Sequence, residues 1–465
     1  MAKHPDSVPG MLTRAELTPL IESGAVETVL AVFPDMYGRL MGKRITGHFF
    51  LEHVADHGMF TCDYLLACDM EMDPVPGYSF TSWERGYGDM ACLVDWPTLR
   101  RAAWLDKTAI VLCHLRTEQG DAPIEVAPRQ ILQQQVQRAH DRGFLAKGGS
   151  EIELYVFKET YDSARQKHYH DLQTFGSYIE DYHIFQGTKE DPLIGAIVRA
   201  LDHSGVPVEF SKGEWGPGQQ EINLRYCDVL EQADRNVLYK HAAREIAHAQ
   251  GLAVTFMAKW DEHLAGSSMH IHLSLWDAAG RVPVFPGETP LGPVRASDTF
   301  RWFLGGLMRH AADLAVCYAP SVNSYKRYQS GSFAPTAIAW SYDNRTAGFR
   351  VVGHGSALRV ECRIPGADAN PYLAYAAALA SGLDGIDHQI EPPAVFQGDV
   401  YAAQALPRVP GNLRDAIARF EGSELARTAF GPAVVEHYLH FLRTEQRKFD
   451  EVVTSWERAR FFERA

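Results

Sequence analysis

Short apolar runs separated by turn residues dominate the beginning of the chain. Residues 26–33 are apolar and β-branched, a turn follows, and residues 39–46 form a second extended run. This order predicts a β-hairpin. Thr13 and Glu16 have the spacing of a capping box, which predicts a helix before the hairpin. We therefore expect residues 1–115 to form a small α+β unit.

Further along the chain, helical and strand-like patterns alternate. Helices are predicted at residues 130–142, 191–205, 229–250, 298–316, 372–383 and 434–461. Strands are predicted at residues 151–157, 207–210, 253–260 and 270–275. Residues 160–190 are rich in His, Tyr and Asp without a clear period, so they are predicted to form a long loop. The pattern indicates a mixed sheet of polar strands covered by helices.

The composition indicates a folded protein without a nucleic-acid or membrane partner. Hydrophobic residues make up 46% and charged residues 22% of the 465 residues, which argues against a mostly disordered chain. The net charge of −13 favours neither nucleic acid nor an anionic membrane. The seven cysteines are scattered, so neither a disulfide framework nor a zinc site is predicted. There is no signal-peptide pattern and no apolar run of about 18 residues, and we expect a cytoplasmic protein.

Polar residues two positions apart recur on several predicted strands, and such residues point to the same face. The pairs are Glu151 with Glu153, Glu221 with Asn223, His270 with His272, and Glu361 with Arg363. Glu214 precedes Glu221 across a glycine-rich turn that would fold both carboxylates toward one site. One such pair is usually a solvated face, and without a metal clustered carboxylates would repel one another. Together they favour a site for two or more Mg²⁺ or Mn²⁺ ions, which prefer oxygen ligands and, for manganese, accept an imidazole.

Residues 321–363 carry many basic side chains among apolar, strand-like residues. The basic residues are Lys326, Arg327, Arg345, Arg350, Arg359 and Arg363. Guanidinium groups fork onto carboxylates and phosphates, so a converging set favours anionic substrates, whereas a solvated face is the alternative that the pattern leaves open. Metals beside arginines point to a polyphosphate. The chain has neither a P-loop nor a dinucleotide-binding fingerprint, so a nucleotide would bind in another way.

These motifs resemble those of the glutamine synthetase family, and the resemblance spans nearly the whole chain. The matching segments are residues 149–153, 214–223, 266–274, 323–327, 344–350, 359–363, 370–373 and 382–386. The resemblance implies an α+β fold, with an N-terminal β-grasp-like domain (residues 1–115) and a catalytic domain (residues 125–465). In the catalytic domain it implies a largely antiparallel, curved sheet covered by helices.

The resemblance also implies an activity and an assembly. In such enzymes ATP phosphorylates the γ-carboxylate of L-glutamate, and an amine then attacks the γ-glutamyl phosphate. The family further implies a homo-oligomer, a dodecamer of two hexameric rings. In that assembly the N-terminal domain of a neighbouring subunit completes each active site.

The family implies a role for each matching residue. The metal nearer to glutamate would be held by Glu153, Glu214 and Glu221, and the metal that bridges the ATP phosphates by Glu151, His270 and Glu361. Glutamate would be bound by Gly266, Arg327 and Arg363. ATP would be bound by His272, Ser274, Arg345, Arg350 and Arg359, with Arg345 and Arg327 also catalytic.

Three positions depart from the pattern of the ammonia-using members. Those enzymes carry a glutamate immediately before the Ala-Pro that follows the arginine motif, where this chain has Phe333. The asparagine expected before Gly266 is Ala265. The N-terminal motif whose aspartate serves ammonium is replaced by residues 60–65, in which Asp63 is the candidate catalytic residue.

The ATP and metal parts are thus kept, while the parts for ammonium are altered. We therefore predict a ligase that joins glutamate to an organic amine, and Phe333 favours a small alkyl or aromatic amine over a polycation. An aromatic face can also bind a cation, so a cationic head group on the amine is compatible with Phe333. Three alternatives stay open: an ordinary ammonia-using glutamine synthetase, a catalytically silent structural or regulatory relative, and a related ligase that uses another acid.

Overall fold

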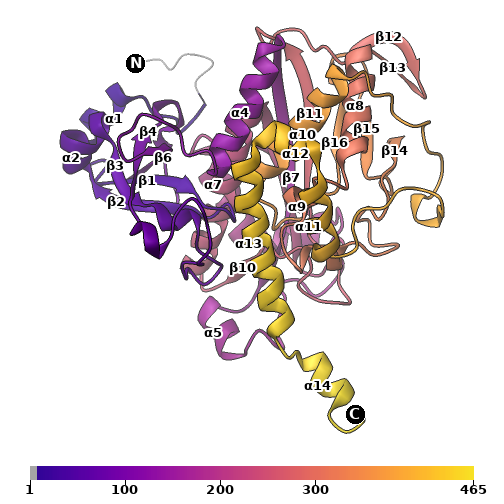
Figure 1. The fold of residues 1–465 in the computed structure, drawn as a ribbon. Coiled ribbons are helices and arrows are strands. Elements are labelled where there is room, and N and C mark those ends of the chain that lie inside the picture. Colours follow the sequence, from indigo (N-terminus) through magenta and orange to yellow (C-terminus); the bar gives the residue numbers. More distant parts are fainter. Residues whose placement is uncertain (1–7) are drawn as a thin grey trace.

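The computed structural model describes residues 8–465, and its N-terminal part is built on a six-stranded sheet (Figure 1). The strands are β1 (Thr28–Pro34), β2 (Leu40–Thr46), β3 (Met59–Cys62), β4 (Asp89–Val94), β5 (Arg100–Arg101) and β6 (Thr108–Thr117). Their order is β2-β1-β6-β4-β3, with β5 beside β6. Only β1 and β6 run parallel. The predicted N-terminal domain includes residues 1–7, which lie outside the described residues.

The predicted hairpin and the helix before it are confirmed. Strands β1 and β2 are antiparallel. The Asp35 carboxylate closes their turn by accepting hydrogen bonds from the amides of Tyr37 (3.0 Å) and Arg39 (2.8 Å). Helix α1 (Arg14–Glu22) begins with the predicted capping box of Thr13 and Glu16. Local turn and cap chemistry therefore determine this part of the fold.

The larger sheet has the order β14-β15-β16-β11-β7-β9-β8, with β10 paired to β7. Its strands are β7 (Phe144–Phe157), β8 (Val208–Gly213), β9 (Gln219–Asp228), β10 (Ala253–Thr255), β11 (Met269–Asp277), β14 (Trp340–Tyr342), β15 (Phe349–Val352) and β16 (Arg359–Cys362). All pairs are antiparallel except β14 with β15. A separate hairpin joins β12 (Pro286–Leu291) to β13 (Val294–Ala296). The predicted α+β class, with a largely antiparallel main sheet, is confirmed.

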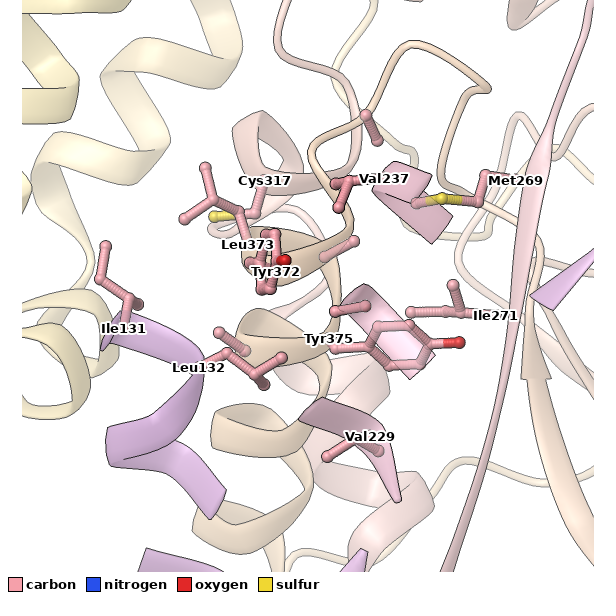
Figure 2. Packing of buried hydrophobic residues seen from close by; sticks show 14 of the residues in the cluster. Ile131, Leu132, Val229, Val237, Met269, Ile271, Cys317, Tyr372, Leu373 and Tyr375 are labelled. Atoms are coloured by element: carbon pink, nitrogen blue, oxygen red, sulfur yellow. The ribbon is translucent and has the colours of Figure 1, made fainter. Parts of the chain in front are cut away.

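Helices pack around α10 (Pro371–Asp387), an alanine-rich helix that is buried along most of its length. It contacts α4 (Pro128–Asp141), α7 (Val229–Ala249) and α8 (Asp298–His310), while α4 and α7 also contact β7. Figure 2 shows this core, with Tyr372 and Tyr375 of α10 between side chains of α4, α7 and β11. The Tyr375 hydroxyl donates to the carbonyl oxygen of Gly149 at 2.6 Å. The core therefore fixes β7 next to its first glutamate.

The remaining helices include two short ones in the N-terminal unit, and the others belong to the larger unit (Figure 1). They are α2 (Gly47–Phe49), α3 (Ala55–His57), α5 (Tyr161–Gln166), α6 (Ile184–Asp202), α9 (Ala315–Tyr318), α11 (Leu413–Gly422), α12 (Glu424–Phe430), α13 (Pro432–Glu451) and α14 (Ser455–Phe461). Within residues 8–465, no helix combines the length and the apolar character required to cross a membrane.

Several predicted boundaries are wrong. Residues 160–190 are not one long loop, because they contain α5 and the start of α6. Helix α6 begins at Ile184, and Pro192 lies inside it although a helix start was predicted there. The helix continues because Leu193 and Ile197 are buried, and packing outweighs the hydrogen bond that a proline cannot donate. The strand predicted from residue 253 ends at Thr255. The helices predicted at residues 298–316 and 434–461 are each two helices, α8 with α9 and α13 with α14.

Buried ion pairs join the N-terminal unit to the helices of the large sheet. The Arg129 guanidinium on α4 lies 2.8 Å from Asp234 of α7 and 2.7 Å from Asp95, which follows β4. The fully buried Arg100 lies 3.1 Å from Glu231 of α7. Removing one partner of a buried pair strands the other charge. The two units are thus held in a fixed relation.

Candidate active site

Three neighbouring strands bring a first group of possible metal ligands together. Glu151 on β7 lies directly opposite His270 on β11, and Glu361 on β16 lies opposite the next inward residue of β11, His272. One ligand atom from each of Glu151, His270 and Glu361 lies within 4.8 Å of the others. The Nδ1 atom of His270 is 3.3 Å from Glu151 and 3.5 Å from Glu361. Strand register therefore creates this cluster.

The surroundings keep these carboxylates ionised and the histidine neutral. Burial alone would raise the pKa of Glu361, but nearby positive charge, that of Arg363 above all, outweighs it and holds the pKa at about 2. Burial, and then Arg363, lowers the pKa of His270 to about 4. A neutral imidazole beside charged carboxylates is the protonation state that a metal ion requires.

A second group of ligands lies further along β7. Glu153 is opposite Glu221 of β9, and Glu214 follows the end of β8. Their ligand atoms also lie within 4.8 Å of one another. Burial, and then the charge of Glu214, raises the pKa of Glu153 to about 7, and burial followed by Glu151 raises that of Glu221 well above its usual value. The protein therefore supplies too little positive charge to balance the three carboxylates of this cluster.

One cation that sequence reasoning missed lies in the second cluster. The Lys212 ammonium on β8 contacts Glu214 and lies 3.8 Å from Glu221. It is also 4.7 Å from the ring of Tyr182. Lys212 stands two positions before Glu214, the same spacing that identified the glutamate pairs, so the signal was present in the sequence.

Both clusters fit divalent ions on the chemistry of their donors. The first offers two carboxylates and an imidazole, a donor set that manganese accepts, and the second offers three carboxylates, which suit magnesium or manganese. The raised pKa of Glu153 indicates repulsion that a dication would relieve, since one lysine offsets one of three negative charges. Glu151, His270 and Glu361 would hold one ion, and Glu153, Glu214 and Glu221 the other.

The second cluster opens into a cavity of about 200 Å³, the first cavity, which is lined by acidic and basic side chains. The predicted residues on its wall are Glu151, Glu153, Glu214, Glu221, Gly266, His270, Arg327, Phe333, Arg345, Arg350 and Arg363. The alternative of a separate solvated face is therefore wrong for the four arginines of this wall, Arg327, Arg345, Arg350 and Arg363. Gly266 is required there, because a Cβ atom would meet the Arg327 side chain at 2.5 Å and the Ala258 carbonyl at 2.7 Å.

Two arginines of the first cavity are buried and only partly satisfied. Arg327 donates to the carbonyl oxygens of Arg363 and Ile364, and Arg363 donates to Glu361 at 2.6 Å. The Nε atoms of both Arg327 and Arg363 are buried without a hydrogen-bond partner among the described residues. Unpaired buried donors are costly and mark places where a ligand group belongs. The two guanidinium groups are therefore suited to an anionic ligand.

A second cavity of about 460 Å³ adjoins the first, and Glu151, Phe210 and Asn223 line both. It contains the predicted ATP residues His272, Ser274 and Arg359. The Arg359 Nε donates to His272 Nδ1 at 3.3 Å, and His272 Nε2 lies 3.0 Å from Glu151. A chain of polar contacts thus runs from this cavity to the first metal cluster.

The second cavity also contains aromatic rings that the sequence did not identify. Tyr226, at the end of β9, is half exposed on its wall, and Trp276 of β11 lies nearby. The Trp276 indole donates to Ser274 at 3.0 Å, and the Lys147 ammonium lies 3.9 Å above its ring. Aromatic faces beside cationic side chains suit a nucleobase joined to phosphates. The second cavity thus fits a nucleotide, and its phosphates would extend toward Glu151.

Two aromatic rings on the wall of the first cavity meet edge to face. Phe333 and Trp215 have ring centroids 5.7 Å apart at an interplanar angle of 61°. Phe333 has a positive φ of 59°, which is uncommon for a bulky residue, and its carbonyl accepts a hydrogen bond from Arg363 at 3.4 Å. Ala265 also lines this cavity. Two of the three positions that depart from the ammonia-using pattern therefore lie here.

The third position that departs from the ammonia-using pattern, at Asp63, lies elsewhere. Asp63 lies after β3 in the N-terminal unit, where its carboxylate accepts a hydrogen bond from Thr81, and it lines neither cavity. Its predicted catalytic role therefore requires a second copy of the chain and stays a prediction.

Residues 125–461 match the family model described as glutamine synthetase, catalytic domain. The chain belongs to the glutamine synthetase family. It is 46% identical over 449 residues to the gamma-glutamylethanolamide synthetase of Streptomyces coelicolor, covering 97% of this chain and 95% of that protein. It is 34% identical over 446 residues to the glutamate–isopropylamine ligase of a Pseudomonas species, covering 95% and 96%.

Solved structures agree with this assignment. The complex of GmaS with ADP aligns with a TM-score of 0.83 at 28% identity, covering 96% of this chain and 99% of that one. GmaS without ligand aligns equally well, at 0.83 and 28%. The predictions of the family, the fold class and a ligase activity are confirmed. The roles of individual site residues stay predictions.

Proposed function

We propose that this family member joins the γ-carboxylate of L-glutamate to an organic amine, using ATP. The observation that carries the proposal is the pair of adjoining cavities. The first is lined by five of the six metal-ligand candidates and by four arginines, and the second has aromatic and basic walls. One relative is named for an ethanolamide product and another for an isopropylamine substrate, and both names support an amine other than ammonia. Phe333 and Trp215 support a small alkyl or aromatic amine.

In this proposal Arg327 and Arg363 bind the carboxylates of glutamate. Their buried, unpaired Nε atoms supply charged donors for an oxygen. Gly266 leaves room for the substrate beside Arg327. ATP binds in the second cavity, with its base between the rings of Tyr226 and Trp276 and its phosphates toward Arg359. The γ-phosphate and the γ-carboxylate then meet where the cavities join.

The reaction has two steps. The terminal phosphoryl group of ATP passes to an oxygen of the γ-carboxylate, giving γ-glutamyl phosphate and ADP. The ammonium head of the acceptor first gives up a proton to solvent, and the free amine nitrogen then attacks the acyl carbon. The carbon–oxygen bond to phosphate breaks, and the nitrogen loses a second proton to solvent. Arg345 and Arg350 line the cavity where negative charge accumulates and stabilise it. Mg²⁺ or Mn²⁺ bound by the two clusters would supply further positive charge between carboxylates and phosphates.

The decisive experiment is phosphate release from ATP with Mg²⁺ and glutamate against a panel of amines. The panel contains ammonium, ethanolamine, isopropylamine, aniline, putrescine and spermine. The proposal expects the highest kcat/KM with one of the small organic amines. Efficient use of ammonium alone would favour the ordinary glutamine synthetase. No turnover with any amine would favour a silent relative, and ATP hydrolysis without need of glutamate would favour a ligase for another acid.

We also propose that the active enzyme is a homo-oligomer, in keeping with the dodecamer expected from the family. Asp63 lies outside both cavities of its own chain, so its role needs a neighbour's N-terminal unit. Light scattering on the purified protein gives the mass. A monomer that is fully active would remove Asp63 from the site.

A further inference from the structure

We propose that Asp181 is the carboxylate that binds the ammonium group of the acceptor amine, beside the Trp215–Phe333 ring pair that encloses its substituent. The site would then select a primary amine with one cationic head and a short, uncharged substituent. This inference rests on the proposed function and identifies the amine subsite within it. Phe333 removes a carboxylate that the ammonia-using pattern has, and Asp181 supplies one from a different segment.

Asp181 has a side chain that is available to a ligand. It lines the first cavity with Glu214 and forms no hydrogen bond or ion pair with any of residues 8–465. Burial, and then the charge of Glu214, raises its pKa, while Lys212 and Arg345 oppose that shift. Lys212 is already in contact with Glu214. An ammonium group placed beside Asp181 would therefore meet a carboxylate whose charge the protein does not neutralise directly.

The backbone on both sides of Asp181 is anchored, because the Tyr182 amide after it donates to the Gly213 carbonyl at 3.4 Å and Glu180 before it is also held. Glu180 is buried, and its carboxylate accepts hydrogen bonds from Gln220 (2.7 Å) and from the Gly218 amide (3.2 Å). The Glu180 amide donates to the Glu214 carbonyl at 3.2 Å. This approach needs a glycine at position 213, since a Cβ there would lie 2.6 Å from Glu180. The segment is thus docked on the turn that carries Glu214 and Trp215.

The ring pair gives the second, independent observation. Trp215 directly follows Glu214, and both Trp215 and Phe333 line the first cavity while remaining about half exposed, at 49% and 47%. A ligand that covers these two exposed rings removes apolar surface from water, which favours binding. The carboxylate of Asp181 and the two rings therefore offer complementary surfaces to the head and the substituent of one small amine.

The test is steady-state phosphate release by the full-length enzyme, comparing Asp181→Asn with wild type. A hydrogen bond to a charged group is worth about 1.5–3 kcal/mol, so KM for ethanolamine should rise about 10- to 100-fold. KM for ATP and for glutamate should change little. Asp181→Glu should recover part of the loss. Asp171→Asn is the matched control, because Asp171 is exposed on the same segment, lines neither cavity and should behave as wild type.

A second variant tests the ring pair. Trp215→Ala should raise KM for isopropylamine more than KM for ammonium, since ammonium has no substituent to enclose. If wild type uses small amines and Asp181→Asn keeps its amine KM, the inference is overturned while the proposed function stands. If wild type uses no amine, both are overturned. A rise in KM for glutamate or ATP equal to that for the amine would also overturn the inference.

Discussion

Replacing Arg345 should lower turnover strongly while leaving the stability of the fold unchanged. Its guanidinium is exposed in the wall of the first cavity, and it forms no ion pair or hydrogen bond with the part of the chain that the structure describes. The nearby Asp343 pairs with Arg350 instead. Replacing Arg345 by alanine therefore removes a charge from the site without leaving a partner behind.

The expected size follows from the chemistry of phosphoryl transfer. An arginine that stabilises the charge of that transition state is worth about 10³–10⁵ in rate, or about 4–7 kcal/mol. Substitution of a surface side chain without partners changes the free energy of unfolding by about 0.5 kcal/mol or less. Arg345→Ala should thus nearly abolish turnover and leave Tm unchanged within about 1 °C. Arg345→Lys should lose less, because lysine keeps the charge but not the fork.

The assay is phosphate release with ATP, Mg²⁺, glutamate and the best amine of the panel, paired with thermal melting. Arg281→Ala serves as control, since Arg281 is exposed on a turn and lines neither cavity. Turnover of Arg345→Ala within tenfold of wild type would refute the assigned role. A large fall in Tm would show that the side chain stabilises the fold, contrary to its lack of partners.

Further predictions concern specificity, metal and pH. Phe333→Glu should lower KM for ammonium and weaken isopropylamine use in the same panel, and unchanged ammonium kinetics would locate specificity elsewhere. Mn²⁺ added to the nucleotide-free protein should raise stability by about 2.7 kcal/mol at 100 times its Kd, and Glu153→Ala should remove most of that gain in Tm; an equal gain would contradict the second cluster. Burial holds the pKa of His437 at about 3 in the folded protein, whereas histidine in the unfolded chain has a pKa of about 6.5. Between these two values the unfolded chain binds the extra proton, so the free energy of unfolding decreases as the pH is lowered, by about 1.4 kcal/mol per pH unit. His437→Gln should show a shallower decline of the urea midpoint from pH 6.5 to 5, whereas an unchanged slope would exclude His437 as its source.

The local parts of the fold could be predicted from the sequence because their causes are local. The capping box of Thr13 and the turn closed by Asp35 depend on residues within four positions of one another. The start of α6 could not be predicted. Pro192 is a strong start signal, and only burial of the helix against the rest of the domain explains why it lies inside.

The candidate site shows the same division. Period-two spacing indicated that Glu151 and Glu153 share a face, but it could not show that Glu151 meets His270 while Glu153 meets Glu221. That pairing depends on strand order, which comes from long-range packing and which the family resemblance supplied. Asp181 carried no signal, because it lies in an irregular segment and acts only through its place on the wall of the first cavity.

The metal-ligand candidates stand mostly on strands and the proposed amine-binding residues on connecting segments, which affects how the choice of amine can change. The two metal clusters and the nucleotide wall stand mostly on β7, β9, β11 and β16, whose spacing is locked by sheet hydrogen bonds. Asp181, Trp215 and Phe333 stand on connecting segments at the rim. If Asp181, Trp215 and Phe333 bind the amine as proposed, a change of acceptor needs replacements only in these three connections, while the strands that carry the metal-ligand candidates stay unchanged. Libraries for new amide products would be built by exchanging those connections between relatives.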